Sequence, residues 1–276
     1  MRKFMAGGAA AVFLGILSTA QGLAADLPSI KEAPVVPPVS SGWRFEATLN
    51  GWAPSSIANV GIRKLPTFDS NVGFFTLLRH LNGVAPVAVT AKSENFILGL
   101  DLFWSAASAG AHVRASETAL APYGGLNAHM RLGETLLTGF AGMRLPIPMT
   151  NLTAYGIAGA RFTNVNLTLD FDTAFPNVGL SAKQSENWTS PIVGFTVNYT
   201  ISDKWFLTSE ADIGGTGNSA TWQAFGALGY NWTSHISSTV GFRALYVDYR
   251  KYNDSGGSFR FQQTLLGPQA QITYAF

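Results

Sequence analysis

From residue 43 to the C-terminus, apolar and polar residues alternate in segments of about ten residues that are separated by turn residues. The last segment shows the pattern most clearly, because apolar residues occupy every second position. A period of two is that of a β-strand, and about ten tilted residues cross the apolar part of a bilayer. The pattern predicts a transmembrane antiparallel up-and-down β-barrel with its apolar faces toward lipid. In the last segment the lipid-facing residues would be Leu266, Pro268, Ala270, Ile272, Tyr274 and Phe276.

About ten strands are predicted, with eight or twelve left open because residues 55–63 could add a hairpin. An even number places both chain ends on the periplasmic side, with short turns there and longer connections outside. The short gaps at 93–95, 146–151, 202–203 and 234–235 alternate with long gaps at 53–83, 107–124 and 169–189, as this arrangement requires. The expected strands are 43–52, 84–92, 96–106, 125–145, 152–168, 190–201, 204–213, 220–232, 236–250 and 259–276.

Two features interrupt the alternation. Near Gln262 and Gln263 the apolar and polar positions change phase, which indicates either a β-bulge or a strand that leaves the lipid zone. In the first long connection, apolar residues at 74, 77, 78 and 81 follow helical spacing, and Gly83 can end the helix. Periodicity does not locate this helix, which could constrict the lumen or cap the outer rim.

The N-terminal region has the pattern of an export signal. Arg2 and Lys3 precede an apolar stretch from Met5 to Leu17, and small residues follow at 22–25, so residues 1–25 are predicted to be a cleaved signal peptide. Residues 26–42 contain four prolines and are expected to form an extended periplasmic linker. The barrel domain is assigned to residues 43–276.

Composition changes this picture little but excludes several functions. Charged residues are only 12% of the chain, which suits a barrel with a lipid-facing exterior. Without residues 1–25 the chain has 16 basic and 16 acidic residues, a balance that gives no support to nucleic acid as a partner. The chain has no cysteine, so thiolate catalysis and cysteine metal sites are excluded. We expect no cofactor and no metal, because the histidines show no ligand spacing.

Charged residues on the predicted interior faces form the main candidate site. Burying isolated charges is costly, so opposite charges on neighbouring strands should pair across the lumen. A dry network would make the barrel a structural anchor, whereas an aqueous gap would make the same charges a pore lining. The candidates are Arg44, Glu46, Asp101, Arg131, Arg161, Glu210, Asp212 and Arg243.

Tryptophans near predicted strand ends form a second candidate group. Their amphipathic rings favour the headgroup level of a membrane, although interior packing is the alternative. The expected aromatic girdle consists of Trp43, Trp52, Trp104, Trp205, Trp222 and Trp232.

Several short motifs occur together over nearly the whole chain: residues 24–28 (AADLP), 43–54 (WRFEATLNGWAP), 60–62 (VGI), 211–215 (ADIGG), 221–224 (TWQA), 241–249 (GFRALYVDY), 267–268 (GP) and 274–276 (YAF). With them the chain resembles a family of small outer-membrane β-barrels abundant in alphaproteobacteria, related to porin-like and OmpA-like surface barrels. The resemblance implies a Gram-negative outer-membrane location and this fold, and no reaction or substrate. It also implies that Tyr274 and Phe276 form the C-terminal signal read by the barrel insertion machinery.

A barrel enzyme acting on lipid A or peptide is the alternative from another class. His235-Ile236-Ser237 is similar to the His-x-Ser of lipid A 3-O-deacylases, but His235 falls in a predicted periplasmic turn. Tyr249 stands where an orienting carboxylate is expected, and Asp248 faces the opposite side of the strand. We therefore expect that the protein is not an enzyme and has no catalytic residue. It is an outer-membrane barrel with a surface role or limited passive diffusion of small hydrophilic solutes, in contact with outer-membrane lipid and lipopolysaccharide.

Overall fold

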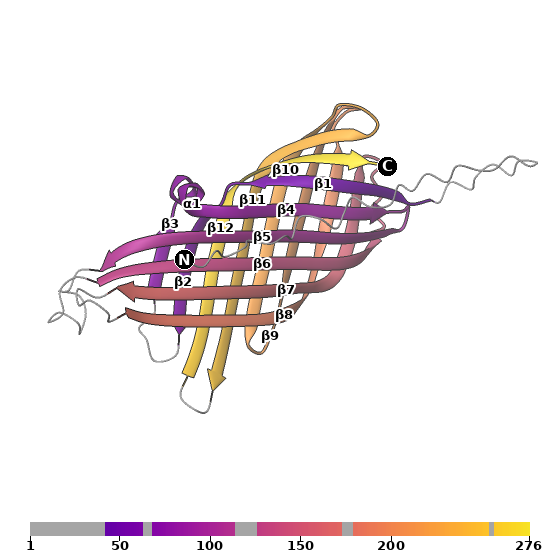
Figure 1. Ribbon diagram of the computed structural model, residues 1–276. Coiled ribbons are helices and arrows are strands. Elements are labelled where there is room, and N and C mark those ends of the chain that lie inside the picture. The colour runs from indigo at the N-terminus through magenta and orange to yellow at the C-terminus, as the bar shows by residue number, and fades with distance from the viewer. Residues whose placement is uncertain (1–41, 63–67, 114–125, 173–178, 254–256) are drawn as a thin grey trace, which may run out of the picture. The chain divides into compact units, whose positions relative to one another are not determined.

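Antiparallel strands run through all the parts of the chain that the computed structural model describes, which are residues 42–62, 68–113, 126–172, 179–253 and 257–276 (Figure 1). The predicted signal peptide and all but one residue of the predicted linker lie outside these ranges. The elements are β1 (Arg44–Trp52), β2 (Ser55–Ile62), β3 (Phe68–Val72), α1 (Phe74–His80), β4 (Leu81–Lys92), β5 (Phe96–Val113), β6 (Leu126–Arg144), β7 (Leu152–Asp172), β8 (Gly179–Thr200), β9 (Trp205–Thr216), β10 (Ser219–Asn231), β11 (Ile236–Asn253) and β12 (Gly257–Ala275).

Ten of these strands close a barrel, which confirms the predicted fold class. Each neighbouring pair is antiparallel, in the order β1-β4-β5-β6-β7-β8-β9-β10-β11-β12, and β1 pairs with β12 to complete the ring. The closing pair runs from Glu46 opposite Ala275 to Trp52 opposite Gln269. The hairpin left open by the sequence at 55–63 is present as the two extra strands β2 and β3.

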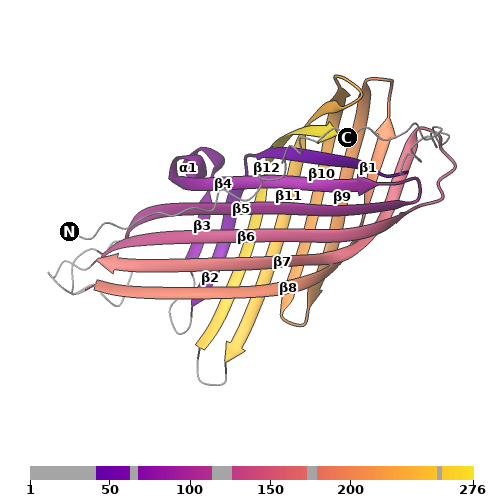
Figure 2. The same cartoon turned by 45° about the vertical axis from the view of Figure 1, so that its right-hand side comes forward.

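At the end away from the short turns, past the last residue of β1, the barrel wall separates into two facing sheets. β2 takes over from β1 as the partner of β12, and β3 pairs with β2 alone among the described strands. On the other side, β9 and β10 join through a tight turn, and the pairing of β8 with β9 reaches only Ile192. One outer sheet is therefore β5 to β8 and the other is β11, β12, β2 and β3, as Figures 1 and 2 show.

The outward faces carry an apolar belt bounded by aromatic residues. On β10, Trp222 and Tyr230 both face outward and lie eight positions apart. At about 3.4 Å per residue and a tilt of about 40°, this separation spans roughly 21 Å along the membrane normal, close to the apolar band of outer-membrane barrels. Trp205 and Trp232 pack edge-to-face against Tyr230, with ring centroids 4.9 and 4.8 Å apart. The belt therefore fits the hydrocarbon core of a bilayer.

Beyond the belt, the polarity of the two strand faces is reversed. On the outer part of β12, Phe259 and Phe261 point inward and are buried, whereas Arg260 and Gln262 face outward. Nearer the periplasm, Gln269 points inward and Ile272 outward. The β11–β12 register is continuous from Ile236–Tyr274 to Asn253–Gly257, so the phase change in the sequence marks the end of the lipid zone and no bulge.

The strands extend further outward than the sequence pattern predicted. β8 begins at Gly179, eleven residues before the predicted start at 190, and β5 continues to Val113. On β8 the added outward residues, such as Lys183, Ser185 and Asn187, are polar and lie beyond the apolar belt. A search for lipid-crossing segments of about ten residues does not detect this part of a strand.

The predicted helix is present as α1, although it ends at His80 and Leu81 already belongs to β4. α1 contacts β2 and β5, and the Phe75 side chain is 75% exposed. None of its described side chains lines the cavity or joins the apolar cluster of the interior. The position at the wall favours a rim helix over a lumen constriction. Among the described residues, no helix has the length and apolar character needed to cross a bilayer.

Candidate functional site

The periplasmic end of the barrel interior is a polar cavity of about 860 Å³. The residues around it come from the inward positions of the strands and from the turns near 203 and 234, so the cavity opens on the side of the short turns. Lys92 donates to Glu46 at 2.7 Å, and Arg44 donates to the carbonyl oxygen of Ser234 at 3.2 Å. These contacts fix the charged side chains of Arg44, Glu46 and Lys92 near the periplasmic opening of the cavity. We call this space the periplasmic vestibule.

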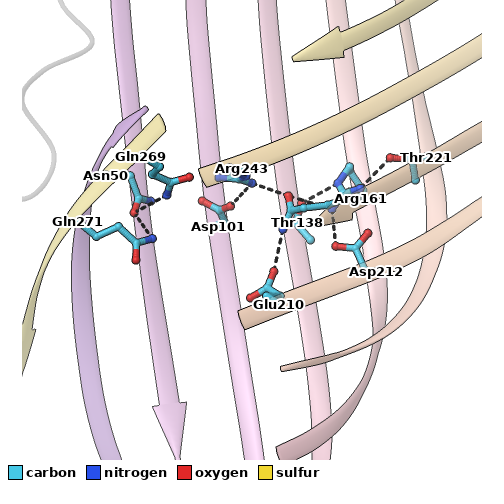
Figure 3. A network of polar contacts seen from close by, with 11 residues as sticks. Asn50, Asp101, Thr138, Arg161, Glu210, Asp212, Thr221, Arg243, Gln269 and Gln271 are labelled. Atoms are coloured by element: carbon cyan, nitrogen blue, oxygen red, sulfur yellow. Dashed lines mark hydrogen bonds and ion pairs between the residues drawn. The ribbon is translucent and has the colours of Figure 1, made fainter. Parts of the chain in front are cut away.

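A buried polar layer lies above the vestibule and centres on Arg161 of β7 (Figure 3). The side chains of Arg161 and Asp212 are each 1% exposed, and Nη2 of Arg161 donates to Oδ2 of Asp212 at 2.8 Å. The same guanidinium donates to Thr138 at 3.1 Å and to Thr221 at 2.7 Å. Since these partners stand on β6, β9 and β10, Arg161 links four strands of the barrel.

Arg243 of β11 forms a second bridge, which crosses the lumen to β5. Its Nη2 donates to Oδ2 of Asp101 at 2.7 Å and to Oε1 of Gln223 at 2.6 Å. Three strands, β12, β1 and β4, separate β11 from β5 on the shorter way round the ring. Gln223 also donates to Glu210 at 2.8 Å, so both arginines and three carboxylates form one network.

An apolar layer closes the interior on the outer side of this network. The two outer sheets both contribute buried side chains to it, among them Phe103 of β5, Trp188 of β8 and Phe261 of β12. Trp52 packs edge-to-face on Phe103 with ring centroids 5.3 Å apart, and the Arg243 guanidinium lies 4.9 Å from the Trp52 ring. The remaining buried members are Val60, Leu136, Val165, Leu167, Leu245, Val247, Phe259 and Leu265.

Strands that are not neighbours are joined across the outer part of this layer. The rings of Trp188 on β8 and Tyr249 on β11 stack in parallel, with centroids 4.3 Å apart. Next to them Lys251 binds the Glu186 carboxylate at 3.0 Å. These contacts close the gap above the tight β9–β10 turn, where the two outer sheets have no shared strand.

Seven of the eight predicted interior charges lie on inward positions. Two groups of contacts join them: Arg44 and Glu46 at the vestibule, and Asp101, Arg161, Glu210, Asp212 and Arg243 in the polar layer. Arg131 is the exception, because it faces outward, is 64% exposed and pairs with Asp170. It lies beyond the apolar belt, where the apolar neighbours Met130 and Leu132 are the ones that pack inward.

Two buried carboxylates, Glu134 and Glu186, were missed by the sequence reasoning. Glu134 lies among apolar inward residues of β6, and the amide of Gln263, in the orientation that satisfies its neighbours, donates to Oε1 of Glu134 at 2.8 Å. The alternation within 125–145 would have placed Glu134 inward, since it shares parity with Leu136 and Thr138, which are both buried. Among the described residues, no group of three or more His, Asp or Glu side chains is placed to hold a metal ion.

Five of the six predicted girdle tryptophans are exposed on the barrel, namely Trp43, Trp104, Trp205, Trp222 and Trp232. Trp52 is not part of a girdle: it is 9% exposed and belongs to the apolar layer. It shares the inward face of β1 with Asn50, and the interior at this level is apolar. The prediction for Trp52 was therefore wrong, and the alternative of interior packing holds for this residue.

The remaining candidates lie at the periplasmic end. Tyr274 and Phe276 are exposed on the outer face and pack edge-to-face, with ring centroids 4.9 Å apart. His235 lies in the turn between β10 and β11, where Nδ1 is 2.8 Å from the Ser234 hydroxyl and the ring stacks on Tyr274. The His-x-Ser segment is therefore at the end of the barrel opposite to the outer leaflet.

Comparison with solved structures gives the same fold. The outer membrane protease OmpT of Escherichia coli is similar over 85% of this chain and 96% of its own, with a TM-score of 0.53 and 11% identity. For the Neisserial surface protein A, 86% of this chain and 98% of its own are matched, with a TM-score of 0.31 and 11% identity. No family model and no curated protein matches the sequence. The fold is that of bacterial outer-membrane β-barrels, and with the apolar belt it places the protein in that membrane.

Proposed function

For a chain with this fold and membrane location, we propose a structural and surface role: a barrel with a sealed lumen that holds two β-sheets above the outer leaflet. The observation that carries the proposal is the pair of side-chain layers across the interior. Arg243 reaches from β11 to Asp101 on β5, and Trp188 and Tyr249 stack between β8 and β11. Since each of these contacts joins strands that are not neighbours, side chains occupy the centre of the lumen.

Charge pairing supports this role over passive diffusion. A solute pathway needs charges that line water, whereas Arg161 and Asp212 are buried at 1% exposure and bind each other. The apolar layer above them adds a second barrier, because a hydrophobic constriction excludes water and ions. The vestibule is then a periplasmic recess that ends at the polar layer.

We also propose that the protein acts without catalysis. Its resemblance to alphaproteobacterial surface barrels supports a role at the cell surface. The likeness to an outer membrane protease concerns the fold only, at 11% identity. Assembly through the insertion machinery, with Phe276 as its signal, is part of the same proposal.

Single-channel recording tests the sealed lumen. The mature protein is refolded, and its heat-dependent gel mobility shows that it is folded. It is then added to a planar bilayer in concentrated salt, with an open sixteen-stranded porin as the positive control. We expect the control to give ohmic steps and this barrel to give none. Stable ohmic steps from the folded barrel would overturn the sealed-lumen proposal and favour passive diffusion.

A further inference from the structure

Two arginines face each other on the outside of the barrel, beyond the apolar belt. Arg250 of β11 and Arg260 of β12 are direct partners in the antiparallel register and lie on the outward face. Side chains of such a pair start about 5 Å apart, and like charges in this position destabilise a sheet. A pair of this kind therefore needs a counter-charge.

The described residues supply only part of that counter-charge. Asp248 binds Arg250, with Oδ2 3.0 Å from Nη2. Arg260 donates to the neutral amide oxygen of Gln262 at 2.9 Å, and its Nε is buried without a partner in the described part of the chain. The residue opposite Arg260 on β2 is Gly61, which places no side chain beside the guanidinium. Among the residues that the structure describes, one carboxylate thus stands against two guanidinium groups.

Neighbouring polar groups hold the two arginines in place. Gln262 donates to the Tyr246 hydroxyl at 3.0 Å, and that hydroxyl lies 3.4 Å from Asp248. The contacts run from Arg260 through Gln262, Tyr246 and Asp248 to Arg250. We call these five residues the outer basic patch. Because the side chains are already positioned, little conformational entropy is lost when they bind a ligand.

The height of the patch in the membrane indicates its ligand. Tyr246 stacks on Trp222 of the outer girdle, with ring centroids 6.1 Å apart. Arg250 is four residues further out on β11, which is about 10 Å above the girdle at the tilt of such strands. Guanidinium groups match the geometry of phosphate oxygens, and this height is within reach of lipid headgroups. Tyr252, 78% exposed on the same face, adds an amphipathic ring next to the pair.

We propose that Arg250 and Arg260 bind a phosphate group of a phosphorylated glycolipid in the outer leaflet. The phosphate lies between the two guanidinium groups and supplies the charge that Asp248 leaves unbalanced. Binding at this place is independent of whether the lumen conducts.

Native mass spectrometry of the full mature protein in zwitterionic micelles tests the site, with bisphosphorylated lipid A, dephosphorylated lipid A and inorganic phosphate as probes. The double variant Arg250→Gln, Arg260→Gln removes the pair, and the control Arg131→Gln, Lys183→Gln removes the same charge from the outward face of the other sheet. Charge-assisted hydrogen bonds of this kind predict a loss of about tenfold in affinity for bisphosphorylated lipid A in the first variant and less than about twofold in the control.

Asp248→Asn provides a gain of function, because it raises the positive charge of the patch, and we expect tighter binding by about threefold. This variant also serves if the double variant does not fold. Equal binding in the double variant and the control, equal binding of dephosphorylated lipid A, or no gain in Asp248→Asn would overturn the proposal. If inorganic phosphate binds with the same dependence on both arginines while the lipid does not, the site takes free phosphate and the lipid assignment is wrong.

Discussion

Removal of Arg161 should be among the most destabilising changes in the barrel wall. The variant Arg161→Met keeps much of the side-chain volume but removes the charge and all the hydrogen bonds to Thr138, Thr221, Asp212 and Gln223. One cation, Arg243, would then face three carboxylates, Asp101, Glu210 and Asp212, in the same buried network. Breaking a buried ion pair on one side typically costs about 3–5 kcal/mol, because the remaining charge is left uncompensated.

The matched control is Arg131→Met, which removes the same side chain from the exposed pair with Asp170. Arg131 is 64% exposed and Asp170 is 30% exposed, so water replaces the lost partner. Exposed pairs contribute only about 0–1 kcal/mol. The difference between the two variants should therefore be at least about 2 kcal/mol.

Urea-dependent unfolding from lipid vesicles measures this difference, with the change in gel mobility between folded and heated samples as the readout. The double variant Arg161→Met, Asp212→Leu should regain part of the stability, since it removes one of the unpaired carboxylates together with the arginine. If Arg161→Met and Arg131→Met lose the same free energy of unfolding, within about 1 kcal/mol, the layer around Arg161 is not a dry network and the reasoning fails.

Two further predictions concern the barrel wall. Phe242, 49% exposed and midway between the levels of Trp222 and Tyr230, should lose about 2–4 kcal/mol when it is changed to Lys, whereas Tyr252→Lys beyond the belt should lose less than about 1 kcal/mol; equal losses in vesicle unfolding would contradict the position of the belt. Gly241→Ala would place a Cβ 2.0 Å from the carbonyl oxygen of Gly226 and should cost at least about 2 kcal/mol, because backbone must move. Gly226→Ala meets no atom within 4 Å, so the same unfolding measurement should show almost no loss for it; a similar loss in both would refute the close approach of β10 and β11.

The alternation of residues was sufficient to predict the barrel and which face of each strand meets lipid. Leu98, Leu207 and Ile272 are exposed on the outside as expected, because a period of two assigns faces without knowledge of the neighbours. The inward positions of Arg161 and Asp212 follow from the same rule. Their pairing does not, since it depends on which strands the closed ring places opposite each other.

The side chains that fill the interior of the outer half could not be predicted from the sequence, for a physical reason. Apolar residues were assigned to the lipid side, and this assumption fails once a strand leaves the membrane, where Val165 and Leu167 pack inward and the polar Asn166 faces outward. The stacking of Trp188 on Tyr249 joins residues 61 positions apart and arises only because the β9–β10 turn is short. No local pattern in the sequence contains that information.

The change of polarity along each long strand also has a consequence for the membrane itself. If the barrel sank by two residues, Gln262 would enter hydrocarbon, and if it rose by the same amount, the exposed Tyr274 and Phe276 would leave the periplasmic interface. Because strands from both outer sheets, such as β7 and β12, show the change, tilting the barrel would correct one side at the expense of the other. In a bilayer of unsuitable thickness, hydrophobic mismatch must therefore be relieved by the lipid. The bilayer thins or thickens around the barrel, whose position along the membrane normal stays fixed.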